Sequence, residues 1–182
     1  MSGGQTSPTS AEAYDRLFRA KARAELEQAD ALARGSSRVS WSGDEIATVA
    51  LVKGTPGEAD TRAGHALAGP DGEAAHKALD ALGLAPERFA ICSRVGKAGA
   101  AARAKRLRLA IEAVDPRIVV ALDGEAAADL AAAFGLDSLG FGTPVSVGGR
   151  RFLAVDGLEA SLADEKRKRL VWRQLKTLKT TG

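Results

Sequence analysis

Cysteine is almost missing from this 182-residue sequence, in which Cys92 is the single example. One thiol cannot close a disulfide within the chain, and it cannot supply the thiolates of an all-cysteine zinc site or an iron–sulfur cluster. Histidine is scarce as well, because only His65 and His76 are present and they lack the spacing of a zinc-binding helix. We therefore expect no bound metal, no iron–sulfur cluster and no cofactor.

Long apolar runs are also missing. No stretch approaches the roughly 20 apolar residues of a membrane-spanning helix, and the N-terminal MSGGQTSPTS lacks the pattern of a signal peptide. We expect a cytoplasmic protein with no membrane partner. Aromatic residues make up only 4% of the chain, which predicts a core of Leu, Val, Ile and Ala. The length suits one domain, which we place at residues 9–182 after a disordered tail at residues 1–8, and we expect a monomer.

Acidic residues are in slight deficit, which gives a formal net charge of +3. The excess of positive charge is concentrated in residues 94–117, where Glu112 and Asp115 are the only acids, and in DEKRKRLVWRQLK near the C-terminus. Such runs can contact nucleic-acid phosphates, but they form the solvated faces of helices more often. The charge pattern is therefore compatible with DNA as a partner and does not identify one.

Short apolar, β-branched runs alternate with helical patterns along the chain. Thr9 and Glu12 have the spacing of a helix capping box, and we expect the first helix to continue to about Gly35. Two runs around Gly148-Gly149 predict a hairpin. The other elements are expected strands at 46–52, 88–93 and 118–122, and expected helices at 72–84, 98–115, 125–134 and 161–179. This alternation predicts an α/β fold, a three-layer α/β/α sandwich around a four-stranded, mostly parallel sheet.

Ligands of such sheets bind beyond the carboxyl ends of the strands. Four segments should therefore surround one crevice: residues 53–58, 93–99, 123–124 and 156–158. This expectation comes from topology alone and does not depend on the identity of the family.

These four segments, in this order, resemble the uracil-DNA glycosylase superfamily, and most closely its bacterial iron–sulfur branch. VALVKGTPGE resembles the family's first strand and its Gly-acid-Ala-Pro-Gly-Glu loop, and AGHALAGPDG resembles a segment that reads Gly-Arg-Pro-Phe-x-Gly-x-x-Gly in that branch. RFAICSRVGK is similar to the second strand, where the family carries Thr-Asn, and FLAVDGLEASL lies where it has a His-Pro-Ser loop. The resemblance covers about Ala22 to Leu178. It implies a glycosylase-like fold and, as the family's activity, hydrolysis of N-glycosidic bonds in DNA repair.

The positions that carry the family's chemistry hold other residues here, and the four cysteines of its cluster are missing. Gly54 lies where the family has a water-orienting acid, and a glycine cannot polarise water. Leu67 replaces an aromatic that stacks on the flipped base, and Ser93 replaces the Asn that reads the pyrimidine edge. Asp156 replaces the His that stabilises the departing base, whereas residues 56–58 match. The resemblance therefore implies the family fold with a degenerate active site.

The leading hypothesis is a divergent protein that binds DNA or a base and lacks the residues for uracil excision. Its base pocket would be formed by Lys53, Gly54, Thr55, Pro56, Gly57, Leu67 and Ser93. Its contacts to DNA phosphates would come from Arg94, Lys97, Arg103 and Arg106.

Two alternatives remain open. The protein could be an active DNA glycosylase in which Asp156 or Glu58 activates water, although Glu58 is equally compatible with an exposed turn and Asp156 with a backbone cap. It could also be a protein-interaction module on the same fold, with the helix at 125–134 or the first helix, 14–34, as the docking face.

Overall fold

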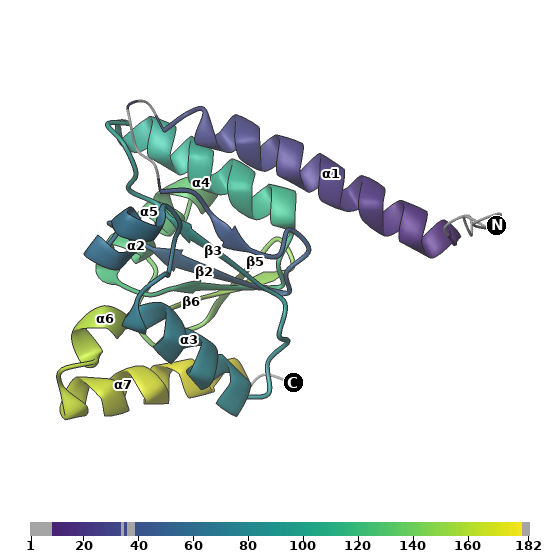
Figure 1. Cartoon of the computed structure of the whole chain (residues 1–182). Helices are drawn as coiled ribbons and strands as arrows, with labels where there is room; N and C mark the ends of the chain where they lie inside the picture. The colour runs from purple at the N-terminus through teal and green to yellow at the C-terminus, as the bar shows by residue number, and fades with distance from the viewer. Residues whose placement is uncertain (1–8, 34, 36–38, 180–182) are drawn as a thin grey trace.

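A single sheet with helices on both of its faces forms the body of the protein in the computed structural model, which describes residues 9–33, 35 and 39–179 (Figure 1). The tail expected at residues 1–8 lies outside the described residues. Four inner strands run parallel in the order β3-β2-β4-β6, as the alternation of strands and helices predicts. They are β3 (Arg88–Cys92), β2 (Val49–Lys53), β4 (Ile118–Ala121) and β6 (Arg150–Ala154).

The expectation of four strands is wrong, because the sheet has six strands and is mixed. Antiparallel strands lengthen it at both edges: β1 (Ser42–Gly43) pairs with β3, and β5 (Val145–Val147) pairs with β6. β1 was missed because two polar residues give no periodic signal. β5 is the first arm of the predicted hairpin, and both glycines of its turn, Gly148 and Gly149, adopt the positive φ that such turns require.

The strands are buried on both faces and divide the core into two layers. In β2, Ala50 and Val52 face one layer while Val49 and Leu51 face the other, as the two-residue period of a strand dictates. The first layer is completed by α1 (Ser10–Asp30), α4 (Ala100–Val114) and α5 (Gly124–Phe134). The second is completed by α3 (Pro70–Ala81), α6 (Leu158–Ser161), α7 (Glu165–Lys176) and the short 3₁₀ helix η1 (Thr177–Lys179). A further helix, α2 (Glu58–Ala63), lies at the carboxyl ends of the strands.

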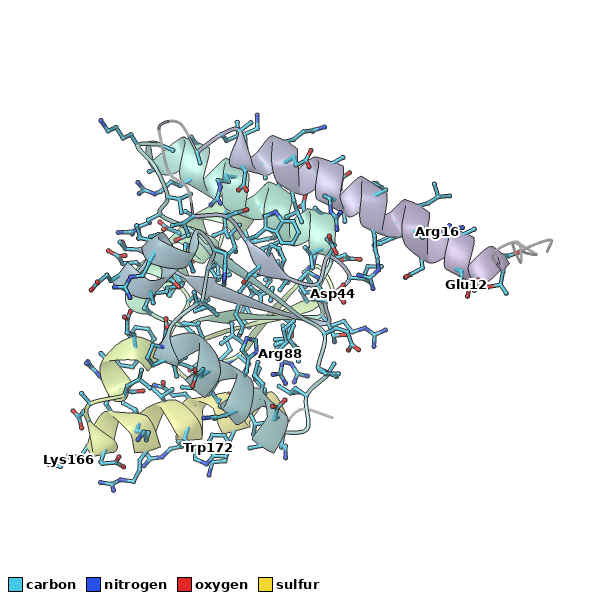
Figure 2. The ribbon with its side chains drawn as sticks, viewed as in Figure 1. Glu12, Arg16, Asp44, Arg88, Lys166 and Trp172 are labelled. Carbon is cyan, nitrogen blue, oxygen red and sulfur yellow. The ribbon has the colours of Figure 1, made fainter. Side chains whose placement is uncertain are left out.

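The first helix begins as the capping box predicts, because Thr9 and Glu12 exchange both capping hydrogen bonds. It ends at Asp30, before the expected Gly35. Its buried residues lie in its second half, and its first half projects beyond the body with Tyr14 73% and Leu17 70% exposed (Figures 1 and 2). In contrast, Leu130 and most alanines of α5 are buried, and only Ala128 and Ala132 are exposed apolar residues on this helix.

One predicted phosphate contact, Arg106, belongs to the interior. It is 1% exposed, donates to the Asp30 carboxylate at 2.7 Å and to the Cys92 carbonyl oxygen at 2.8 Å, and so ties α4 to α1 and to the end of β3. The expectation that it contacts DNA is wrong, because its helix position is on the buried stripe.

No helix among the described residues is long and apolar enough to cross a membrane.

We expect Arg106→Ala to lower the free energy of unfolding by about 3 kcal/mol, because it removes a buried cation and leaves the Cys92 carbonyl and Asp30 without their partner. Urea unfolding followed by circular dichroism measures the change. Lys105→Ala, at the adjacent exposed position of the same helix, is the matched control and should stay within about 0.5 kcal/mol. Equal effects of the two substitutions would contradict this role for Arg106.

Candidate functional site

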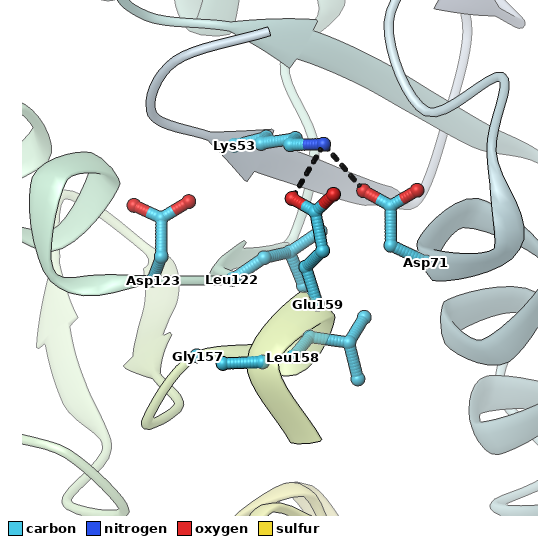
Figure 3. Close-up of a pocket in the computed structure, with 8 residues that line it drawn as sticks. Lys53, Asp71, Leu122, Asp123, Gly157, Leu158 and Glu159 are labelled. Atoms are coloured by element: carbon cyan, nitrogen blue, oxygen red, sulfur yellow. Dashed lines mark hydrogen bonds and ion pairs between the residues drawn. The ribbon is translucent and has the colours of Figure 1, made fainter. Parts of the chain in front are cut away.

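A pocket of about 370 Å³ lies at the carboxyl ends of β2, β4 and β6, where topology predicts the crevice (Figure 3). Its volume is within the range of ligand sites, roughly 300–1,000 Å³. It combines charged groups with apolar walls and is lined by Lys53, Asp71, Leu122, Asp123, Gly157, Leu158, Glu159 and Ala160.

Lys53, the last residue of β2, is the centre of a buried ion cluster. Its ammonium lies 2.7 Å from an Asp71 oxygen and 3.0 Å from oxygens of both Asp60 and Glu159. Three acceptors match its three N–H groups, so none is left for another partner. Burial lowers the pKa of Lys53, but the hydrogen bonds from these carboxylates outweigh that effect and raise the pKa above its ordinary value. The amine therefore carries its charge at neutral pH.

Asp60 and Asp71 are held in place by the starts of two helices. Asp60 is the third residue of α2 and accepts the backbone N–H groups of Gly57 at 2.8 Å and Ala68 at 2.9 Å. Asp71 lies in the first turn of α3, directly after the proline that opens it, where the helix dipole favours a carboxylate. Burial raises the pKa of Asp60, but the Gly57 N–H and the Lys53 ammonium more than offset this and lower it.

Sequence reasoning missed all three partners of Lys53, and the signal that was available concerns Asp60. The available signal was the acid three residues after Gly57, because a carboxylate at that spacing is typical of a helix start. Nothing local connects it to Lys53.

Glu159 differs from the rest of the ion cluster in its exposure. Its side chain is 61% exposed, whereas those of Lys53, Asp60 and Asp71 are almost completely buried. It comes from α6, a helix of four residues, and forms one side of the pocket (Figure 3). Its second carboxylate oxygen retains the capacity to accept a hydrogen bond from a ligand.

The space beside Gly54 is already occupied by acids from α5. Asp123 caps α5 through the Ala126 N–H at 2.8 Å and also accepts the Gly54 N–H at 2.9 Å. A Cβ at position 54 would lie 2.5 Å from the Cβ of Glu125 and 2.8 Å from an Asp123 oxygen. No side chain fits there without displacement, so the family's acid cannot simply be restored at this position.

Ser93, expected to read a base, is not part of the pocket lining. It is 1% exposed and donates its hydroxyl to Asp129 at 2.7 Å. Arg94 donates to the same oxygen at 2.9 Å and to Glu125 at 2.9 Å. Arg103 lies 3.9 Å from Asp129 and donates to the Ala98 carbonyl oxygen at 3.2 Å. Two of the predicted phosphate contacts are therefore already paired with carboxylates, while Lys97 is exposed.

Leu67 and the two predicted catalytic acids are also absent from the pocket lining. Leu67 is 7% exposed and packs into the core layer of α3. Glu58 is 87% exposed and pairs with Arg62 on the outer side of α2. Asp156 lies 3.7 Å from Arg167 on α7.

From the predicted first loop, Lys53 lines the pocket, the Gly54 backbone contacts Asp123, and Gly57 lies beside Lys53 and Glu159. Thr55 and Pro56 stay at the surface side of the loop.

The fold and the site define an α/β protein with a ligand-sized pocket behind a Pro-Gly-Glu loop. The family model described as the Uracil DNA glycosylase superfamily matches residues 42–176, and the chain belongs to this superfamily. A comparison with curated proteins finds no match.

We expect Lys53→Met to destabilise the protein by about 3–5 kcal/mol at pH 7, because two buried carboxylates then face each other without a cation. The loss should be smaller at pH 5, since in the variant a proton can replace the missing charge. Urea unfolding at both pH values measures it, with exposed Lys97→Met as the control.

The free energy of unfolding of the native protein should fall in acid, whereas the deficit of Lys53→Met should become smaller. Because the folded-state pKa of Asp60 lies below its ordinary value of 3.8, its contribution to stability is complete well above pH 4 and is lost as the pH falls through the folded-state pKa. A Lys53→Met variant whose deficit grows towards pH 5 would contradict the ion cluster as described.

Proposed function

We propose that this protein is a divergent member of the superfamily that binds a nucleobase, free or in a DNA strand, and does not excise uracil with the family's usual residues. The observation that carries the proposal is the pocket at the carboxyl ends of the strands, where two leucines face a rim of fixed charges. An apolar slot with a few polar groups at its edge suits a planar heterocycle.

The charges of the pocket favour a ligand that donates hydrogen bonds. One ammonium and three carboxylates line it, from Lys53 and from Asp71, Asp123 and Glu159. The ammonium is fully engaged by Asp60, Asp71 and Glu159. Acceptors therefore outnumber available donors, which favours an amino-bearing base such as cytosine, adenine or guanine over uracil.

The same charges oppose uracil excision. A departing uracil carries negative charge in the transition state, and catalysis requires donors or cations that stabilise it. Here it would meet carboxylates, and the acid that would orient water is replaced by Gly54, whose surroundings leave no room for a side chain.

Base recognition is better supported than contact with the DNA backbone. Of the four predicted phosphate contacts, Arg94 and Arg103 lie against Asp129, Arg106 is buried, and Lys97 alone is exposed. Few side chains are therefore available for phosphate contacts. Because phosphate contacts supply much of the affinity for DNA, we propose that any DNA binding at this end of the strands is weak.

We expect Glu159→Gln to weaken binding of an amino-bearing nucleoside by about tenfold, because it removes an exposed charged acceptor from the pocket. Titrations of cytidine, adenosine, guanosine and uridine, followed by ligand-observed NMR or calorimetry, measure the affinities. At least one amino-bearing nucleoside should bind more tightly than uridine.

Glu58→Gln provides the matched control, because it makes the same charge change at an exposed residue outside the pocket lining. Binding of none of the four nucleosides, or an equal loss in both variants, would exclude base binding in this pocket.

A second candidate, hydrolysis of an N-glycosidic bond, is favoured by one observation. The Asp123 carboxylate lines the pocket and lies 2.8 Å from the point where the Cβ of the family's acid would be. It could accept a proton from water that attacks the sugar carbon while the base departs with the bonding electrons. Asp123, rather than Asp156 or Glu58, would then be the general base, since those two do not line the pocket.

We expect no alkali-labile sites when oligonucleotides that contain uracil, hypoxanthine or a thymine mismatch are incubated with the protein. Denaturing electrophoresis after alkali treatment detects such sites. Cleavage that Asp123→Asn abolishes and Asp156→Asn leaves intact would instead establish the glycosylase. Asn is an equally good helix cap, so the variant should keep the start of α5.

A further inference from the structure

A second polar pocket lies at the opposite end of the strands, where β4 and β6 begin. Its volume is about 360 Å³, and it is lined by Arg117, Ile118, Ser146, Gly149, Arg150 and Arg151. Because β4 and β6 are parallel, their first residues are both far from the carboxyl ends that form the base pocket.

All charged residues that line this second pocket are arginines. The base pocket, in contrast, has one ammonium and three carboxylates in its lining. One of the three arginines, Arg150, pairs with the exposed Asp115 at 2.6 Å. The pocket therefore retains an excess of positive charge.

The strand register places Arg117 beside Arg150 on one face of the sheet, whereas Arg151, the next residue of β6, points to the other face. Arg117 directly precedes β4, and its carbonyl oxygen accepts the Arg151 N–H at 2.8 Å. Ser146 pairs with Arg151 in the β5–β6 register, so the two side chains share the face that Arg117 and Arg150 do not use. The Arg151 guanidinium donates to the Leu178 carbonyl oxygen at 2.9 Å and is thereby fixed against η1.

Two of the guanidinium groups have unused donors. Arg150 has a buried Nε–H without a hydrogen-bond partner in the structure. Arg117 is exposed, and its side chain makes no hydrogen bond or ion pair with any described residue. The Arg150 Nε is out of reach of a ligand, but the exposed guanidinium of Arg117 keeps its donors for a ligand that supplies oxygens.

We propose that this arginine pocket binds the phosphate group of a phosphorylated ligand through Arg117 and Arg150, which lie on the same face of the sheet. Guanidinium groups match phosphate oxygens with paired, charge-assisted hydrogen bonds. The volume leaves room for the group that carries the phosphate. That phosphate belongs either to a small molecule or to a nucleic-acid strand, and the two sources share the same chemistry.

Ligand-dependent thermal stabilisation of the full chain tests the proposal, because a ligand that binds the folded state raises the melting temperature. The probes are inorganic pyrophosphate and a short single-stranded DNA oligonucleotide, compared with sodium chloride at equal ionic strength. We expect saturable stabilisation by at least one of them. Stabilisation by pyrophosphate identifies a small phosphorylated ligand, and stabilisation by the oligonucleotide alone identifies a nucleic-acid strand.

Arg117→Gln should weaken the affinity for the stabilising probe by about tenfold, because it removes charged donors from an exposed side chain that carries no internal contact. Arg150→Gln is the second variant and should weaken the same probe. Arg16→Gln makes the same charge change on the projecting end of α1, at a site remote from the pocket (Figure 2), and should bind like the native protein.

Either of two results would overturn the proposal. In the first, neither probe stabilises the protein beyond sodium chloride. In the second, stabilisation persists unchanged in Arg117→Gln and Arg150→Gln, or falls equally in Arg16→Gln. The base pocket plays no part in these measurements, so their failure leaves the proposed base binding unaffected.

Discussion

The buried ammonium of Lys53 is the constraint around which the functional end of the fold is built. An isolated charge at the end of a central strand would be too costly to bury, so the structure must bring carboxylates to it. Asp60 and Asp71 do so from the first turns of α2 and α3. Asp60 also accepts N–H groups from Gly57 and Ala68, so the cluster fixes both ends of the segment between them.

This cluster changes what the loop after β2 does. The loop keeps the Pro-Gly-Glu of the superfamily, but its first position carries a lysine that points into the interior and its second carries Gly54. The carboxylates of Asp123 and Glu125 accept the backbone N–H groups of this loop. Acids are therefore abundant beside the loop. They belong to the start of α5 and bind the loop backbone, and they are not side chains of the loop itself. The charge beside this loop therefore comes from the start of α5.

Local patterns were sufficient to predict the parts of the fold that depend on local chemistry. The β-branched runs of β2 and β4, the capping box of α1 and the glycine hairpin before β6 each depend on neighbouring residues, and each was predicted. The position of the pocket also followed, because strand direction alone decides it. β1 and α2 were missed because they are too short to show a period.

The partners of the charged residues could not be predicted in this way. Lys53 pairs with Asp71, Ser93 with Asp129, and Arg106 with Asp30, across separations of 18, 36 and 76 residues. No local pattern encodes such contacts. As a result, Arg106 and Ser93 were assigned to ligands although their hydrogen bonds are made within the protein.

The linings of the two pockets differ in charge and lie at opposite ends of the strands, with three carboxylates and one ammonium in the first and three arginines in the second. Strands of four or five residues, at about 3.3 Å per residue, separate these ends by roughly 15 Å. A nucleotide whose base lies in the base pocket is therefore too short for its phosphate to reach the arginines at the other end of the strands. Phosphates that are attracted to the arginines are in turn repelled by Asp123 and Glu159. The net charge of +3 conceals this polarity, because it sums two regions that the sheet keeps apart.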